Sequence, residues 1–141
     1  MRDKATILIV DTDETSSLLL KEIVLSVLPH TYKILLMSDG SEAADLCLRE
    51  KPKAVFTEIR LKGMDGIRLT KYIKEFDPGI PVIIQTAIPK EYIRQQICEC
   101  CCDCYITKPL DLTELRKHTM LCASPISLAG IIKTKWKSAS F

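Results

Sequence analysis

The sequence predicts an α/β domain with a doubly wound parallel sheet and helices on both of its faces. Three observations support this fold class. Short, continuously apolar runs recur five times, segments with helical spacing alternate with them, and polar residues directly follow most of the runs. Because consecutive parallel strands need right-handed crossovers, such strict alternation predicts one sheet that is covered on both sides.

The expected strands are short and apolar, as strands buried on both faces usually are. They cover residues 7–10, 32–37, 54–57, 81–84 and 104–107. Charged or turn-forming residues flank these runs, which favours strands over segments of buried helix.

The first two helices follow from apolar spacing and from the residues that interrupt it. Apolar residues recur at helical spacing over 18–27, and Pro29 ends the pattern. The turn and cap at 39–41 begin a second helix, which stops at Pro52.

Three further helices complete the alternation. Glycines at 63–66 break the chain before the third helix, which ends at 77–79. A fourth helix is expected from about residue 90 to residue 100. Asp111 and Glu114 form a capping-box pattern that begins a fifth.

Composition limits the class of protein. A chain of 141 residues is long enough for one domain with a proper core, and its 47% hydrophobic and 27% charged residues are ordinary for a globular protein. The net charge of +2 gives no general attraction to nucleic acid or to membranes. Since no apolar run approaches the roughly 20 residues that span a bilayer, we expect a cytoplasmic protein.

Polar side chains gather at the carboxyl ends of the expected strands, where ligands bind in sheets of this kind. They are Asp11, Thr12 and Asp13 after the first strand, Glu58 after the third, Thr86 and Ala87 after the fourth, and Lys108 and Pro109 after the fifth. Carboxylates can hold Mg²⁺, and a hydroxyl with an ammonium group can hold phosphoryl oxygens. Four such groups at one sheet edge favour a common pocket over unrelated loop residues.

Four segments of the chain carry a specific resemblance. ILIVDTDET, AVFTEIRLKGMDG, PVIIQTA and DCYITKPLD are similar to the signature segments of CheY-like receiver domains of two-component response regulators. The resemblance covers about residues 5–121. It implies a flavodoxin-like (βα)5 sheet with the strand order 2-1-3-4-5.

The resemblance also implies roles for single residues. Asp11 takes the first acidic position, and Thr86 takes that of the switch hydroxyl. Lys108 is the phosphate-binding lysine, and the Lys108–Pro109 bond is expected to be cis. Tyr105 fits the aromatic residue that moves with the hydroxyl on activation.

Two positions depart from the family pattern. Thr12 stands where receivers carry a second acid, and a neutral hydroxyl is a weaker Mg²⁺ ligand than a carboxylate. Asp13, one residue further on, is a candidate substitute. We therefore expect at most a weakened Mg²⁺ site at Asp11, Asp13 and Glu58.

The larger departure is Glu58 at the position of the phosphate-accepting aspartate. Its carboxylate can pair with Lys108 and accept a hydrogen bond from Thr86, which would partly imitate an aspartyl phosphate. Three interpretations stay open: a receiver locked toward an active-like state, a receiver inactive in phosphotransfer, and a receiver that uses glutamate as acceptor.

The resemblance implies a signalling module of two-component phosphorelays and not an enzyme. Because Glu58 replaces the phosphate-accepting aspartate, we expect the module to be independent of phosphorylation. The implied partners are a sensor histidine kinase or a downstream effector at the face of the fourth helix, fifth strand and fifth helix, or a second copy in a homodimer. No membrane or direct nucleic-acid partner is expected. An FMN enzyme is disfavoured because the acidic loop from Asp11 to Glu14 would repel a phosphate.

Five of the seven cysteines crowd into one short stretch, residues 98–104. Cysteine behaves as a small hydrophobe, so packing is one interpretation, although Cys101 would be strained where receivers usually carry glycine. The alternative is a metal or redox sensor that uses Cys98, Cys101, Cys102 and Cys104. A second CxxC pair separated by a loop is missing, which weighs against zinc.

The chain divides into a receiver-like domain over residues 1–122 and a tail or start of a linker over residues 123–141. Pro125 interrupts the fifth helical pattern, and residues 127–141 contain three lysines and Trp136 but no acid. The segment is either a loosely packed end or a basic docking segment.

Overall fold

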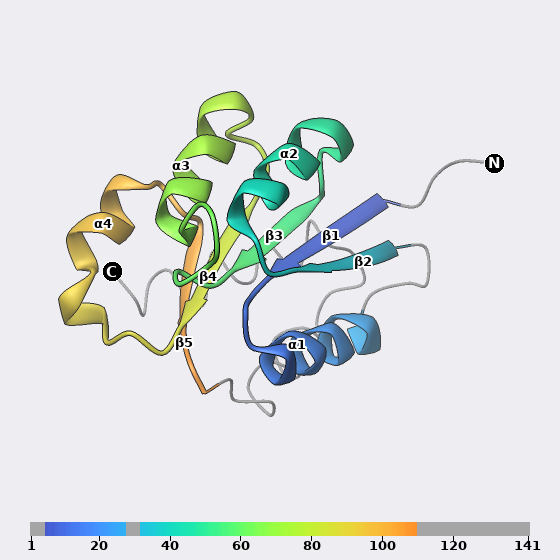
Figure 1. Ribbon diagram of the computed structural model, residues 1–141, viewed down its shortest axis with the longest axis horizontal. Coiled ribbons are helices and arrows are strands. Elements are labelled where there is room, and N and C mark those ends of the chain that lie inside the picture. Colours follow the sequence, from blue (N-terminus) through green and yellow to red (C-terminus); the bar gives the residue numbers. More distant parts are fainter. Residues whose placement is uncertain (1–4, 28–31, 110–141) are drawn as a thin grey trace.

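The computed structural model describes residues 5–27 and 32–109 (Figure 1). The predictions for the fifth helix from Asp111, for Cys122 and for the tail over 123–141 lie outside these residues. Within them, no helix is both long and apolar enough to cross a membrane.

One five-stranded parallel sheet forms the centre of the molecule. Its strands are β1 (Ala5–Val10), β2 (Tyr32–Met37), β3 (Ala54–Thr57), β4 (Val82–Thr86) and β5 (Cys104–Thr107). They lie in the order β2-β1-β3-β4-β5, and every neighbouring pair is parallel, so the predicted strand order is confirmed. The fourth strand begins one residue later than predicted and continues to Thr86.

The helices α1 (Glu14–Val27), α2 (Gly40–Glu50) and α3 (Gly66–Phe76) lie where the apolar spacing predicts them. The prediction of one helix from about residue 90 to residue 100 is wrong in its start and its continuity. A 3₁₀ turn over Lys90–Tyr92 comes first, Ile93 leaves the helical region with φ −133° and ψ 10°, and α4 covers only Arg94–Glu99. Neither Pro89 nor Ile93 caps the following turn with a side chain. The two pieces are joined by backbone hydrogen bonds at Ile93, whose N–H donates to the carbonyl of Lys90 and whose carbonyl accepts the N–H of Ile97.

Apolar clusters on the two faces of the sheet hold the helices in place. On one face, Leu20 and Val24 of α1 pack against Ile7 and Ile9 of β1. On the other face, α2 and α3 pack against the intervening residues of β1, and Ile97 of α4 packs on β4 and β5. Figure 1 shows α1 on one side of the sheet and α2 and α3 on the other. The alternation of side chains along each strand therefore fills both layers.

The N-terminus of α3 lies directly against the backbone that follows β3. A Cβ atom added to Gly66 would lie 2.0 Å from the carbonyl oxygen of Glu58. The Gly66 N–H also donates a hydrogen bond of 2.8 Å to the carbonyl of Ile59. Glycine is therefore required at position 66 because no side chain fits between helix and strand end.

We expect Gly66→Ala to destabilise the fold by about 1–3 kcal/mol, since overpacking typically costs that much. Urea unfolding followed by circular dichroism measures the loss. Gly79→Ala is the matched control, because the nearest atom to its added Cβ is a side-chain oxygen of Asp77 at 3.2 Å. Equal stability of the two variants would contradict the close approach at Gly66.

Candidate functional site

Backbone hydrogen bonds fix three charged residues at the carboxyl edge of the sheet. The N–H of Asp11 donates to the last carbonyl of β2 at 2.9 Å, and that of Glu58 donates to the last carbonyl of β1 at 2.8 Å. The N–H of Lys108 donates to the last carbonyl of β4 at 2.8 Å. Each of these residues is the first one after its own strand, and its N–H binds the end of the adjacent strand. The three residues therefore meet at one edge of the sheet.

These residues line a cavity of about 620 Å³ together with residues of the neighbouring loops. Its lining residues are Asp11, Thr12, Asp13, Glu58, Arg60, Thr86, Ala87, Ile88, Pro89, Tyr92 and Lys108. The cavity thus contains every residue predicted at the strand ends except Pro109, which follows Lys108 through a cis peptide bond.

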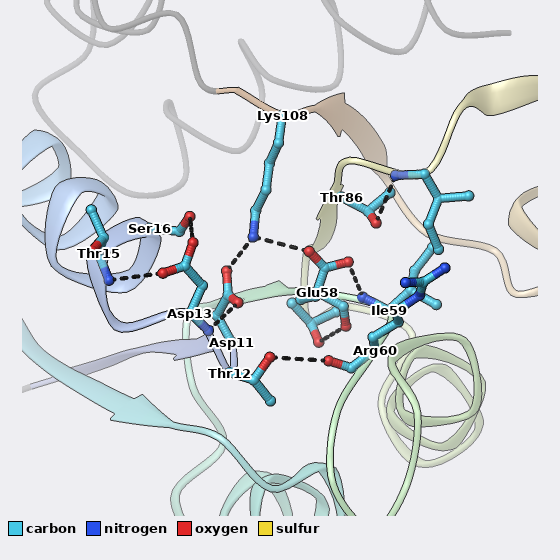
Figure 2. A network of polar contacts seen from close by, with 12 residues as sticks. Asp11, Thr12, Asp13, Thr15, Ser16, Glu58, Ile59, Arg60, Thr86 and Lys108 are labelled. Carbon is cyan, nitrogen blue, oxygen red and sulfur yellow. Dashed lines mark hydrogen bonds and ion pairs between the residues drawn. The ribbon is translucent and has the colours of Figure 1, made fainter.

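The Lys108 ammonium group lies between two carboxylates (Figure 2). Its Nζ is 2.6 Å from Oδ2 of Asp11 and 2.9 Å from Oε2 of Glu58. Burial alone lowers the pKa of Lys108, but hydrogen bonds to Asp11 and Glu58 more than offset it, so the pKa is raised overall. The lysine is therefore charged at neutral pH.

Backbone amides orient both carboxylates toward this lysine. Oδ1 of Asp11 accepts the N–H of Asp13 at 2.9 Å. Oε1 of Glu58 accepts the N–H of Ile59 at 2.7 Å. Because one oxygen of each carboxylate binds an amide, the other faces Lys108 in a fixed direction.

The other two polar residues after β1 bind partners other than Glu58. Asp13 accepts hydrogen bonds from the N–H of Thr15 and the hydroxyl of Ser16, and the Ser16 bond lowers the pKa of Asp13. The hydroxyl of Thr12 lies 3.5 Å from the carbonyl oxygen of Arg60. Figure 2 shows Asp13 turned toward the start of α1 and Thr12 turned toward Arg60.

This arrangement leaves few carboxylate oxygens free for a magnesium ion. Mg²⁺ needs several oxygens in nearly octahedral geometry, and the cation between the Asp11 and Glu58 carboxylates is already the Lys108 ammonium group. Within residues 5–27 and 32–109, no three or more His, Cys, Asp or Glu side chains are placed to hold a metal ion. The Asp13 carboxylate is used to cap α1.

Thr86 does not make its expected contact with Glu58. The hydroxyl oxygen of Thr86 accepts the N–H of Ile88 at 3.3 Å, and the oxygens of Glu58 accept from Ile59 and Lys108. Tyr105 is buried behind the pocket, and its hydroxyl donates to the carbonyl of Ile88 at 2.6 Å. Ile88 therefore links the predicted switch residues through its backbone.

Four lining residues were not predicted from the sequence, namely Arg60, Ile88, Pro89 and Tyr92. Arg60 stands two residues after Glu58, and the other three follow Thr86 closely in the chain. Their place in the loops directly after β3 and β4 was the available signal. Tyr92 is 73% exposed at the rim of the cavity.

The cysteines predicted as a cluster do not converge. Cys98 and Cys101 are exposed, whereas Cys102 and Cys104 are buried in apolar clusters on opposite faces of the sheet. Cys101 has φ +62°, so the predicted strain at this position is confirmed. Cys100, which was left out of the predicted group, lies next to Cys102 in the same buried cluster.

Comparison with known proteins gives a consistent result. The response regulator receiver domain family matches residues 7–120. The chain is 33% identical over 110 residues to sporulation initiation phosphotransferase F of Bacillus subtilis (strain 168), covering 78% of this chain and 86% of that protein. It is 30% identical over 132 residues to the transcriptional regulatory protein ZraR of Klebsiella oxytoca, covering 89% of this chain but 29% of that protein.

Solved structures share the fold. One is the receiver domain of the sensor histidine kinase PA1611 from Pseudomonas aeruginosa PAO1, which has a magnesium ion coordinated in its active site cleft. It has a TM-score of 0.69 at 23% identity, over 84% of this chain and 96% of that one. A CheY-like receiver domain protein from Methanospirillum hungatei JF-1 has a TM-score of 0.70 at 23% identity, over 81% and 89%.

We expect Lys108→Met to destabilise the protein by about 3 kcal/mol at pH 7, because it leaves two buried carboxylates without their cation. Urea unfolding at pH 7 followed by circular dichroism measures the loss.

Two variants serve as controls for this measurement. Lys33→Met removes an exposed ion pair of 3.6 Å with Glu50 and should change stability by less than about 1 kcal/mol. Adding Glu58→Gln to Lys108→Met should recover part of the loss. A Lys108→Met variant as stable as the Lys33→Met variant would show that the buried ion pairs contribute little.

Proposed function

We propose that this chain, which belongs to the response regulator receiver family of signalling modules, signals without phosphorylation of residue 58. The observation that carries the proposal is the ion pair between Glu58 and Lys108. Its neighbour Asp11 binds the same ammonium group. In this proposal the charged groups of the pocket are satisfied by one another in the resting protein.

The position of the Glu58 carboxylate argues against phosphotransfer. Its extra methylene moves the oxygens by about a bond length relative to aspartate, and a misplacement of about 1 Å can lower a rate on the order of 100-fold. Oε1 also accepts the Ile59 N–H, and Oε2 faces Lys108. An attacking oxygen would first have to leave one of these partners.

Two versions of this function differ in what Glu58 does. In one, its carboxylate imitates a phosphoryl group and holds an active-like state. In the other, it only neutralises Lys108. The second agrees better with the contacts of Thr86, whose hydroxyl binds Ile88 and not Glu58. A carboxylate also carries at most one negative charge, whereas a phosphoryl group carries about −1.5 to −2.

A weakened magnesium site follows from the same residues. Thr12 offers a neutral hydroxyl where an acid would bind the metal directly, and Asp13 caps α1. Binding of Mg²⁺ would have to compete with Lys108 for both remaining carboxylates. We therefore propose that the pocket has low affinity for the ion and that signalling does not depend on it.

Protein partners are the expected output of a receiver module, and catalysis is not part of the proposal. We place the partner surface on α4, β5 and the segment that follows β5. The side chains of α4 other than Ile97 are exposed, and Tyr92 projects beside them. A sensor histidine kinase, a downstream effector and a second copy of this chain are the candidate partners, with residues 1–122 as the domain and 123–141 as a tail or linker.

We expect no acyl phosphate on the wild-type protein after incubation with acetyl phosphate and Mg²⁺. Intact-mass spectrometry at neutral pH measures the added phosphoryl group. The expected reason is the geometry of Glu58, whose oxygens bind Lys108 and the Ile59 amide. Phosphate recovered on a peptide that contains Glu58 would overturn the proposal.

The matched control is Thr12→Asp/Glu58→Asp, which restores both acids of the family pattern on the same fold. Labelling of this variant alone would demonstrate that the phosphodonor and the detection work. Glu58→Gln provides the background for labelling elsewhere on the chain.

We expect Thr12→Asp alone to strengthen Mg²⁺ binding by at least about tenfold, because a carboxylate replaces a hydroxyl as ligand. Isothermal titration calorimetry of the wild type and the variant measures the difference. Thr15→Asp, an equal charge added on the first turn of α1, controls for the general field. Equal affinities of wild type and Thr12→Asp would argue against Thr12 as the weak point of the site.

A further inference from the structure

Two buried thiols lie side by side where α4 turns into β5. Cys100 and Cys102 are 1% and 6% exposed, and both pack with Ile84, Ile97 and Tyr105. Their sulfur atoms share one acceptor, since Sγ of Cys100 is 3.2 Å and Sγ of Cys102 3.9 Å from the carbonyl oxygen of Ile97. Each thiol also shifts the pKa of the other.

The backbone between them explains why the side chains of residues i and i+2 meet. Cys101 lies in the left-handed region with φ +62°, which reverses the chain between the two thiols. Asp103 then anchors the turn. Its carboxylate accepts the N–H of Val82 at 2.7 Å and the Lys74 ammonium group at 2.5 Å. The sulfur pair is therefore held by fixed backbone on its β5 side.

The pair combines one acidic and one proton-retaining thiol. The hydrogen bond from Cys102 lowers the pKa of Cys100 to about 7, against the opposing effect of burial. The same hydrogen bond, together with burial, raises the pKa of Cys102. Such a division of roles is typical of thiol pairs in which one sulfur attacks and the other resolves.

We infer that Cys100 and Cys102 are a reversible redox site that peroxides oxidise to an intramolecular disulfide. The Cys100 thiolate attacks one peroxide oxygen, the O–O bond breaks, and a sulfenic acid and hydroxide form. The hydroxide takes up the proton that the Cys100 thiol released and becomes the first water. The Cys102 sulfur then displaces hydroxide from that sulfenic acid, and the Cys102 proton goes into the second water. Two thiols and one hydrogen peroxide thus give one disulfide and two waters, and a dithiol reverses the reaction.

Two of the remaining described cysteines, Cys47 and Cys104, are poorly placed to compete. Cys104 lies in the apolar cluster on the opposite face of the sheet from Cys102. Burial raises the pKa of Cys47 to about 12, so its thiol should be inert. Cys98 and Cys101 are exposed and form the one alternative pair in the same segment.

This site is separate from the pocket around Glu58, and its proposal does not depend on the one for phosphorylation. It does share an apolar cluster with Tyr105, whose hydroxyl binds the carbonyl of Ile88 at the pocket rim. Closing a disulfide would draw both sulfurs away from the Ile97 carbonyl. Oxidation would therefore act on the proposed partner surface from within the fold.

The test uses the full chain with the substitutions Cys98→Ser, Cys101→Ser and Cys122→Ser, treated with hydrogen peroxide, quenched in acid, unfolded and alkylated. Cleavage after Glu99 and before Asp103 isolates the tripeptide 100–102. We expect this peptide to be unalkylated and lighter by two hydrogen atoms, and to become alkylated when dithiothreitol precedes the quench. A peptide that stays fully alkylated, or that carries sulfinic acid at Cys100, would overturn the inference.

Single substitutions then separate the two roles. Adding Cys100→Ser should slow the loss of thiol at residue 102 by at least about tenfold, because the acidic thiol is gone. Adding Cys102→Ala should leave Cys100 to stop at sulfenic acid, which dimedone traps. In the protein with all native cysteines, a disulfide between Cys98 and Cys101 that forms first would also overturn the assignment.

Discussion

The arrangement of the pocket depends on one ammonium group held between two carboxylates. Lys108 binds both Asp11 and Glu58, and it lies 97 positions after Asp11 in the chain. Two neighbouring carboxylates would repel each other without a cation, and the energy of that repulsion is largest where water is excluded. Backbone bonds to the adjacent strands place the charges, and Lys108 makes their proximity favourable. The strand ends and the loops around them therefore form one electrostatic unit.

Much of this architecture could be predicted from the sequence, because it rests on simple regularities. Alternating apolar runs and helical segments lead to a parallel sheet, and the carboxyl ends of parallel strands share an edge. The meeting of Asp11, Glu58 and Lys108 follows from that geometry. The direction of each side chain beyond the strand end cannot be predicted from that geometry, because it depends on which nearby backbone N–H group is free to donate. Glu58 turns to the Ile59 N–H instead of Thr86 for this reason. Likewise, no pattern in residues 90–100 marked the break at Ile93.

Local backbone needs also explain why neighbours in sequence have unrelated contacts. Asp11 serves the pocket, whereas Asp13, two residues later, satisfies free N–H groups at the start of α1. The same principle separates the cysteines. Residues two apart would share a face if both lay in one strand, but β5 begins only at Cys104. Cys102 precedes the strand, and the two side chains pack in clusters on opposite faces of the sheet. The left-handed turn at Cys101 has the reverse effect and brings Cys100 and Cys102 together. Proximity in a cysteine-rich sequence is thus a poor guide to proximity of sulfur atoms.

The missing side chain at Gly66 makes the mechanical properties of the site asymmetric. The start of α3 packs directly against the Glu58 carbonyl with no side chain between them, so a displacement of one backbone segment is expected to move the other. The segment after β4 on the other side of the pocket is less rigid, because a 3₁₀ turn, the break at Ile93 and the short helix α4 stand there in place of one continuous helix. A structural change in the pocket should therefore displace the segment that follows β4 more than the start of α3.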